Sequence, residues 1–281
     1  MGTRVRNWMK ALRTSRKQDV TLHRRMMLYL VFMLLAAAGL LVMVFVSRGL
    51  VLNADDRMVW KLQTRLDQVY EQTSSMLDNY EGYSLNMARQ LGASIDRQME
   101  GRKGFCSEFQ DSPEKLLQLQ KSIYDDLYTT ILMGGSSGVY AVLDATVNSS
   151  LPEADHSRSG LYLRLQNPGV ELVASSDLAL FRGSAEIARE KGIELHNRWN
   201  LEFDTLLVPR YEDLMDESSD ALAEGLSGAD EMFWADKMVL QDTWEEVILL
   251  CTPIKGASGE KYGVCGVELS NLFFRNAYLL R

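Results

Sequence analysis

Histidine is the first residue type to consider for metal binding or acid–base chemistry, and this sequence of 281 residues contains three. His23 lies near the N-terminus, whereas His156 and His196 fall in predicted loops far apart in the sequence. Protein metal sites usually repeat their ligands at short spacing, and none of the three histidines has a partner at i+3 or i+4. The sequence therefore predicts no metal centre and no cofactor.

Residues 134–138 read Gly-Gly-Ser-Ser-Gly and match the G-x-S-x-G pattern of a serine nucleophile. That motif needs a strand before the serine and a helix after it, whereas here a helix is predicted before it and a strand after it. The glycines also lack the Lys-Ser/Thr ending of a phosphate-binding loop. We interpret the segment as a helix-to-strand turn and expect that the chain is not an enzyme.

The cysteines could form a disulfide. If the predicted hairpin near the C-terminus turns about Ser258, Cys251 and Cys265 lie seven residues on either side of the turn and face each other. Cα atoms of such a cross-strand pair approach to about 4.5 Å, which permits a disulfide at a non-hydrogen-bonded pair. Two buried thiols that pack against each other are the alternative, which the pattern favours. Cys106 has no predicted partner.

The charges are segregated along the chain, which contains 30 Lys and Arg against 38 Asp and Glu, a net −8. Residues 1–25 hold eight Lys or Arg and the single acid Asp19, a net +7, so the remaining residues carry −15. A basic arm of this kind can bind nucleic acid, but this one is short, carries one aromatic residue and borders an apolar segment. We expect a membrane topology signal and no nucleic-acid partner.

The apolar segment at residues 26–47 contains 22 uncharged residues in a row. As a helix it spans about 33 Å, enough to cross a hydrocarbon core of about 30 Å. A cleaved signal peptide has a shorter apolar core and a better cleavage site than Val46-Ser47-Arg48. We therefore predict an uncleaved, single-pass anchor in the cell membrane. The positive flank keeps residues 1–25 in the cytoplasm and places residues 48–281 outside.

Beyond the membrane, one long helix is predicted within residues 48–105, because apolar residues recur at alternating steps of three and four. A parallel dimer stalk and a helix lying along its own globular domain both explain this seam, and both can hold for different stretches. The seam and the apolar segment thus predict two partners, the membrane and a second copy of the chain. The seam consists of Val59, Leu62, Leu66, Val69, Thr73, Met76, Tyr80, Tyr83 and Met87.

Residues 106–281 predict an α+β domain, an antiparallel sheet with flanking helices that follows the transmembrane helix and the stalk helix. Asp111-Ser112-Pro113-Glu114 is typical of a helix start. Alternating or continuous apolar runs predict strands, and the loop 255–260 joins the last two as a hairpin. The predicted strands cover residues 138–144, 160–165, 232–240, 246–253 and 262–269, and the predicted helices cover 113–133, 184–191 and 211–226.

The last third of the chain resembles the extracytoplasmic Cache sensor domains of bacterial membrane receptors, which have a PAS-like sheet after a membrane helix and a stalk. In that family a strand ending in Pro-Ile or Pro-Val returns through a Gly-containing loop as a Gly-Val-x-Gly-(Val/Ile)-(Asp/Glu) strand. The matching segments here are Trp234-Ala235-Asp236-Lys237, residues 247–251 with Pro253-Ile254, Gly259-Glu260-Lys261 and Gly263-Val264-Cys265-Gly266-Val267-Glu268.

The resemblance implies a small-molecule ligand bound on one face of the sheet. It assigns Arg198-Trp199 to the pair that holds a ligand carboxylate in amino-acid-binding members, and Glu268 to the acid on the last strand. Met238 and Leu240 stand where the family places a Tyr and an Asp for the ligand amine. An apolar pair cannot compensate a desolvated ammonium group, so amino-acid sensing by that scheme is not expected.

Trp234, Met238 and Leu240 line the pocket in this interpretation, or they pack in the core. The function predicted from the whole sequence is the ligand-sensing part of a membrane signalling receptor. Its output domain is not visible, so we expect the chain to be truncated after Arg281 or to act through a partner. A membrane-anchored interaction or scaffold protein without a small-molecule ligand is the alternative. A response to small molecules would separate the two.

Overall fold

The computed structural model describes residues 22–47, 54–102, 104–167, 177–216, 232–240 and 243–279. The chain divides into two units, Met1–Gln72 and Thr73–Arg281. In the first unit, helix α2 (Leu22–Ser47) contains the segment Arg24–Val46, which is long and apolar enough to cross a membrane, with a mean hydropathy of 2.7. Its described apolar side chains are exposed. The structure thus forms a helix over the segment that the sequence predicts to cross the membrane.

Helix α3 (Ala54–Met99) belongs to both units. Along the predicted seam, Val59 and Leu66 are exposed, whereas Tyr80 and Met87 are buried in the core of the second unit. From Met76 onward the seam therefore packs on the chain's own domain, as one of the two interpretations predicted. Helix α3 ends at Met99, because Glu100 and Gly101 have positive φ values of 51° and 76°.

The second unit is built on a sheet in the order β5-β4-β3-β1-β10-β9-β7, and β8 also pairs with β9. All of its pairs are antiparallel except β4 with β5. The predicted α+β class is confirmed. The strands of this sheet are β1 (Gly138–Leu143), β3 (Gly160–Leu165), β4 (Leu178–Arg182), β5 (Glu194–Asn200), β7 (Phe233–Trp234), β8 (Met238–Val239), β9 (Glu246–Lys255) and β10 (Lys261–Ser270).

Shorter elements connect and cover these strands. Strands β2 (Ser157–Arg158) and β6 (Phe203–Asp204) form a separate two-stranded sheet. The remaining elements are α4 (Phe105–Phe109), α5 (Pro113–Gly134), α6 (Ala185–Lys191), the 3₁₀ helix η3 (Thr205–Leu207), α7 (Tyr211–Met215) and α8 (Asn271–Leu279).

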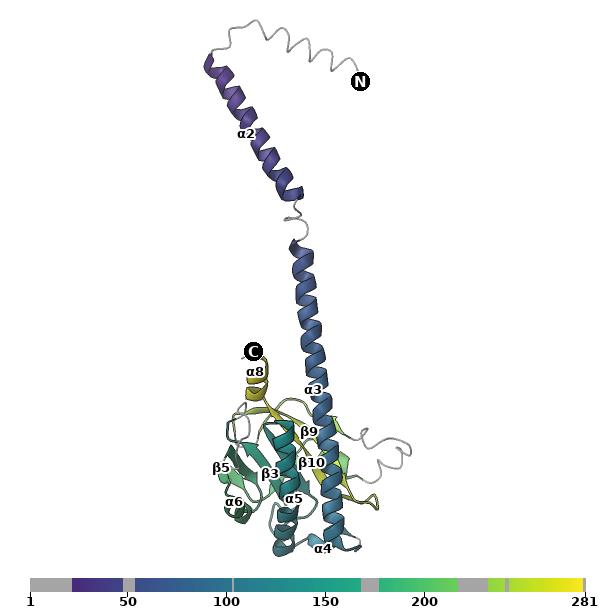
Figure 1. Ribbon diagram of the computed structural model, residues 1–281. Coiled ribbons are helices and arrows are strands. Elements are labelled where there is room, and N and C mark those ends of the chain that lie inside the picture. Colours follow the sequence, from purple (N-terminus) through teal and green to yellow (C-terminus); the bar gives the residue numbers. More distant parts are fainter. Residues whose placement is uncertain are drawn as a thin grey trace. The chain divides into compact units, whose positions relative to one another are not determined.

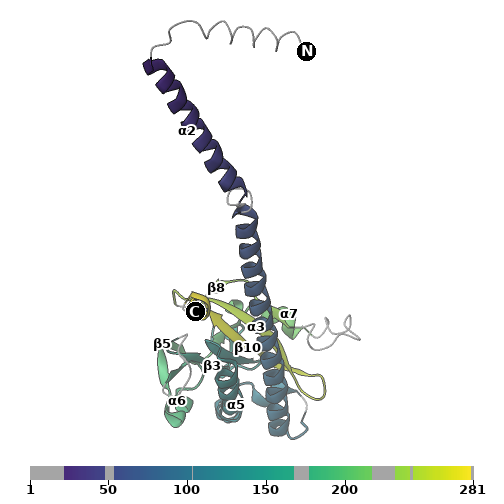
Figure 2. The same ribbon diagram turned by 45° about the horizontal axis from the view of Figure 1, so that its top comes forward.

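Two apolar cores lie on the two faces of the sheet. Helix α5 and the C-terminal part of α3 lie side by side across one face, as Figures 1 and 2 both show, and we call it the helix face. Cys265, Val267 and Leu269 of β10 point into it. The alternate residue Val264 belongs to the second core, on the opposite face, with residues from η3–α7 and β8. Every position of β10 is buried, because both faces are covered.

The structure differs from the sequence predictions at several elements. The predicted helix 211–226 is helical only as far as Met215, and residues 217–226 lie outside the described residues. The predicted strand 232–240 consists of the short strands β7 and β8. Strands β4 and β5 were not predicted, and His196 lies on β5, not in a loop.

The predicted pairing of Cys251 with Cys265 is wrong. Near the turn, Lys261 pairs with Lys255, as a hairpin centred on Ser258 requires, but an irregularity between Lys261 and Gly263 shifts the register by one. Cys251 then pairs with Gly266. A shift of one residue moves a side chain to the other face of the sheet, so both thiols are free and point to opposite cores.

Candidate ligand-binding site

A buried ion pair joins two strands that are not neighbours. Strand β1 separates β3 from β10, and its first residue, Gly138, pairs with Arg164 on one side and with Glu268 on the other. A Cβ atom at Gly138 would lie 2.8 Å from Glu268 Oε2, so the missing side chain leaves the space in which the pair meets. Arg164 Nε lies 2.7 Å from Glu268 Oε2, and Arg164 Nη2 lies 2.9 Å from Oε1.

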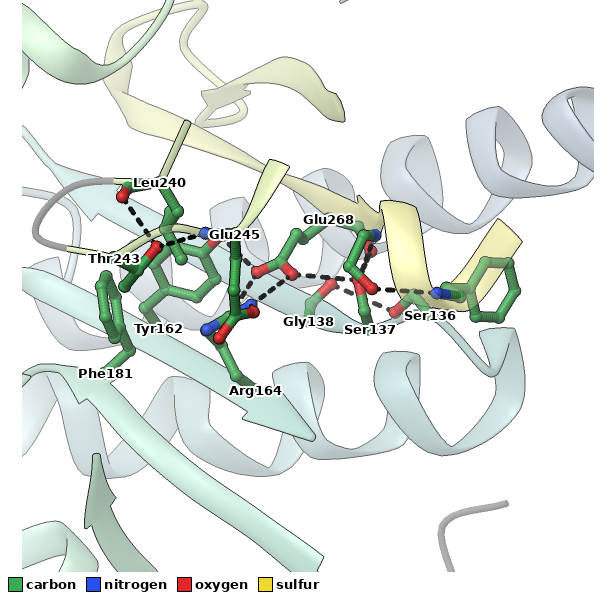
Figure 3. A network of polar contacts seen from close by, with 12 residues as sticks. Ser136, Ser137, Gly138, Tyr162, Arg164, Phe181, Leu240, Thr243, Glu245 and Glu268 are labelled. Atoms are coloured by element: carbon green, nitrogen blue, oxygen red, sulfur yellow. Dashed lines mark hydrogen bonds and ion pairs between the residues drawn. The ribbon is translucent and has the colours of Figure 1, made fainter. Parts of the chain in front are cut away.

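Further donors surround the Glu268 carboxylate. The Tyr162 hydroxyl donates to Oε2 at 2.6 Å, and the Ser137 hydroxyl lies 3.0 Å from Oε1 (Figure 3). Burial alone would raise the pKa of Glu268, but the charge and hydrogen bonds of Arg164, with those of Tyr162 and Ser137, outweigh it and lower the pKa. Glu268 is therefore a charged group fully enclosed by the protein.

A turn at the rim supplies a second carboxylate to Arg164. Glu245 Oε2 lies 2.6 Å from Arg164 Nη2, and the Glu245 side chain is 37% exposed, against 2% for Arg164. The Glu245 carbonyl accepts a hydrogen bond from the Leu240 amide, and the Thr243 hydroxyl donates to the Leu240 carbonyl (Figure 3). We call residues 240 and 243–245 the rim turn. It holds Leu240 and Glu245 beside the buried pair.

A small apolar cavity lies beside this network, on the face of the sheet opposite the helix face. Its volume is about 40 Å³, room for about one water molecule and far below the several hundred Å³ of ordinary ligand pockets. A ligand would therefore require the elements over the cavity to move. The lining consists of Tyr140, Tyr162, Phe181, Arg182, Phe203, Asp204, Leu207, Val208, Met238, Leu240 and Leu249.

An open groove adjoins the cavity. It has a volume of about 580 Å³ and runs between residues 206–210 and 233–238. Leu207 and Met238 line both the groove and the cavity, so these two side chains form the wall between them. Arg210 and Lys237 give the groove positive charge, and Asp236 gives it a negative one. Movement of this thin wall would enlarge the cavity.

Cationic groups surround Phe181, which is part of the cavity lining. An irregularity in the β3–β4 pairing places two β4 residues, Phe181 and Arg182, in the lining. Arg182 Cζ lies 4.1 Å from the Phe181 ring centroid and Arg164 Cζ lies 5.5 Å from it. The His196 ring packs edge-on against the same phenyl group, and burial together with the Arg164 charge lowers the pKa of His196.

The structure divides the sequence-predicted site residues into two groups. Met238 and Leu240 line the cavity, and Glu268 contacts the cavity residue Tyr162. The other three do not line the cavity. The Arg198 side chain is exposed, and its backbone carbonyl accepts a hydrogen bond from Arg182.

The two tryptophans pack against the helix-face core. The Trp199 indole donates to the Gly183 carbonyl at 2.9 Å, and the Trp234 indole donates to Glu81 of α3 at 2.9 Å. Trp234 also borders the open groove.

Sequence reasoning missed Arg164, Arg182 and Glu245. Arg164 alternates with Leu163 and Leu165, a pattern that is typical of a half-buried strand. All six positions of β3 are buried, because both faces are covered. A cation within so apolar a strand is itself the signal, because a buried cation needs a carboxylate partner.

No family model matches the chain, and no curated protein matches it. Among solved structures, "Methyl-accepting Chemotaxis protein X" is 11% identical over 76% of this chain and 63% of its own length, with a TM-score of 0.39. The periplasmic sensory domain of the Campylobacter jejuni chemoreceptor Tlp1 is 16% identical over 76% of this chain and 60% of its own length, with a TM-score of 0.41. The ligand-binding domain of the Pseudomonas aeruginosa PAO1 amino acid chemoreceptor PctC, in complex with GABA, is 14% identical over 71% of this chain and 68% of its own length, with a TM-score of 0.28.

The second of these structures is a periplasmic sensory domain of a chemoreceptor, and the third is the ligand-binding domain of one. The chain spans somewhat less than two thirds of the length of the first two.

Proposed function

We propose that this protein is the ligand-sensing part of a membrane signalling receptor. The observation that supports this best is the cavity on the face of the sheet opposite α3 and α5. It combines aromatic and aliphatic walls with a few fixed polar groups, a composition that is typical of small-molecule sites. In this proposal residues 1–25 are cytoplasmic, 26–47 cross the membrane and 48–105 form the stalk helix, which packs on the domain from Met76 onward. Residues 106–281 form the rest of the extracytoplasmic sensor domain.

Contacts within the second unit offer a route from the cavity to α3. Leu249 of β9 lines the cavity, and Thr252 of the same strand forms a 2.7 Å hydrogen bond with Ser84 of α3. At the hairpin end, the Tyr262 hydroxyl donates to Asp96 of α3 at 2.6 Å. A ligand that binds two arrangements of the sheet with different affinity would shift their populations, and α3 would carry the change toward the membrane.

We also propose a homodimer through the stalk. Val59, Leu62, Leu66 and Val69 keep the heptad spacing and are exposed in the single chain. Replacing Val59 and Leu66 by Asp should abolish cross-linking of the full chain in membranes. The same change at Lys61 and Thr64, which lie on the same helix on the side away from the seam, should leave cross-linking unchanged. Equal cross-linking of both variants would contradict the dimer.

Small-molecule binding is the test that separates a sensor from a scaffold. The full chain in detergent is screened for thermal shifts with a library of small metabolites, and a sensor should show saturable stabilisation by at least one compound. Leu207→Trp would crowd the wall of the cavity and should remove the response.

Leu206→Trp is the matched control. Leu206 is next to Leu207 in the sequence, but its side chain borders the groove and not the cavity. It should keep the response. No stabilisation by any compound, together with tight association with another protein, would favour the scaffold.

A further inference from the structure

The Glu268 carboxylate has no capacity left for a ligand amine. Each of its oxygens has two donors within hydrogen-bond distance: Arg164 Nε and the Tyr162 hydroxyl at Oε2, and Arg164 Nη2 and the Ser137 hydroxyl at Oε1. A carboxylate offers about four lone-pair positions. Arg164 and Tyr162 take three of them, and the fourth faces Ser137, whose single hydroxyl proton is shared between Oε1 and the Glu268 backbone carbonyl at 2.8 Å. Because the Glu268 side chain is fully buried, a ligand amine has no access to that position.

Arg164 is different, because one of its two carboxylate partners is replaceable. Glu268 is fully buried and belongs to a central strand, whereas Glu245 is 37% exposed and belongs to the rim turn. The Glu245 side chain could turn into water without leaving a buried charge unpaired. Arg164 would keep its two contacts with Glu268 and would present one N–H donor of Nη2 to the space that Glu245 leaves.

That space adjoins the cavity. Leu240, which lines the cavity, shares the rim turn with Glu245, and their backbones are joined by a 2.9 Å hydrogen bond. On the other side, Phe181 lines the cavity and lies beneath the Arg164 guanidinium. A molecule whose anionic end replaced Glu245 would therefore extend its other end among the aromatic and aliphatic side chains of the cavity (Figure 3).

We propose that the ligand, if the protein is the sensor proposed above, is an alkyl or aryl carboxylate without an amine, and that its carboxylate replaces Glu245 on Arg164. The exchange leaves the charge of the site unchanged, because one carboxylate enters as another leaves for water. Arg182, a second buried guanidinium in the lining, adds to the preference for an anion. Displacement of Glu245 would release the rim turn and carry Leu240 out of the cavity.

Matched ligands test the charge requirement. Hexanoate and phenylacetate are titrated into the full chain in detergent by calorimetry, beside hexanamide and phenylacetamide, which keep the shape without the charge, and hexylamine and phenethylamine, which reverse it. The carboxylates should bind at least tenfold more tightly than the amides, and the amines should not bind.

Matched variants test the exchange. Glu245→Ala removes the competing carboxylate and should tighten carboxylate binding about two- to fivefold, the range expected for a partly exposed ion pair. Glu246→Ala is the control. Its carboxylate has a similar exposure of 39% and pairs with Lys237 instead of Arg164, so affinity should not change.

The outcomes separate this inference from the function on which it rests. Amides that bind as tightly as carboxylates, binding of the amines, or weaker carboxylate binding by Glu245→Ala would overturn the proposed exchange and leave the sensing function standing. Absence of binding by all six compounds and by the wider metabolite library would overturn both.

Discussion

Replacing Glu268 by Gln should strongly destabilise the protein. The amide keeps the size of the side chain, but its single oxygen can accept from only one of Tyr162 and Ser137. It also leaves the Arg164 guanidinium, which is 2% exposed, without its buried counter-charge. Breaking a buried ion pair in this way costs about 3–5 kcal/mol. Glu245 remains as a partner at the rim, so the lower end of that range, about 3 kcal/mol, is expected.

The assay is urea unfolding of the full chain in detergent, followed by tryptophan fluorescence, with a thermal melt as a check. In a domain of this size a loss of 3–5 kcal/mol lowers the Tm by about 6–20 °C. Arg164→Met should cost a similar amount, because it leaves Glu268 charged and buried. The double variant should lie within about 2 kcal/mol of the wild type, since no buried charge is then left without a partner. Single variants that each lose less than about 1 kcal/mol, or a double variant that loses the sum of both, would refute the reasoning.

The same pair gives a pH dependence of defined sign. The pKa of Glu268 is lowered in the folded protein from its ordinary value of 4.5, so the unfolded chain binds a proton more readily than the folded chain. The contribution of Glu268 is therefore complete above about pH 4.5 and is lost as the pH falls toward the lowered pKa. The difference in the free energy of unfolding between wild type and the double variant should shrink below about pH 4.5 and stay constant from pH 6 to 8.

Two further predictions concern packing and redox state. Gly92→Ala should destabilise the second unit by about 1–3 kcal/mol in urea, because its Cβ atom would lie 2.2 Å from a backbone carbonyl oxygen of β9. Gly82→Ala on the same helix, where nothing lies within 4 Å, should instead stabilise it by up to about 1 kcal/mol. Under native conditions an alkylating reagent should modify the exposed Cys106 alone, since burial raises the pKa of Cys251 to about 12 and also raises that of Cys265. A second fast adduct, or a reductant-dependent mass, would contradict the assigned free thiols.

The sequence predicted those parts of the fold whose signal is local. The hairpin of β9 and β10 is a pair of long apolar runs around a short Gly-containing turn, and α6 carries its own start and stop signals in Ser184 and Gly192. Strand β5 has neither alternation nor apolar character, because it is a mostly exposed edge strand. Its pairing with β4 follows from the course of the chain through α6, which no local pattern encodes.

The hairpin register failed for a different reason. The turn centre was right, since Lys255 and Lys261 do pair. An extra residue at the irregularity before Gly263 then displaced every later pair by one. Gly263 has a φ of 152°, a conformation that favours glycine, yet it reads in the sequence as one of several glycines in the strand. A single bulge was thus enough to turn a predicted cysteine pair into two thiols on opposite faces.

Only part of the candidate site could be predicted from the sequence. Its residues come from strands whose order in the sheet the sequence does not reveal. Glu268 followed from the resemblance of its strand. Its partner Arg164 could be assigned only once β1 was known to lie between β3 and β10, with Gly138 leaving room for both side chains. Glu245 lies near the start of β9 and reaches Arg164 through the fold of the rim turn.

The energies of these contacts bear on how the site can work. A receptor needs two states that differ by a few kcal/mol, so that a ligand of moderate selectivity can shift their populations. The Arg164–Glu268 pair, at about 3–5 kcal/mol when broken, is too costly to open and keeps the sheet side of the cavity fixed. The Arg164–Glu245 contact, partly exposed to water, is worth about 1 kcal/mol or less. The movable part of the site is therefore the rim turn. Arg164 can keep its contact with Glu268 on the sheet while its contact with Glu245 of the rim turn breaks.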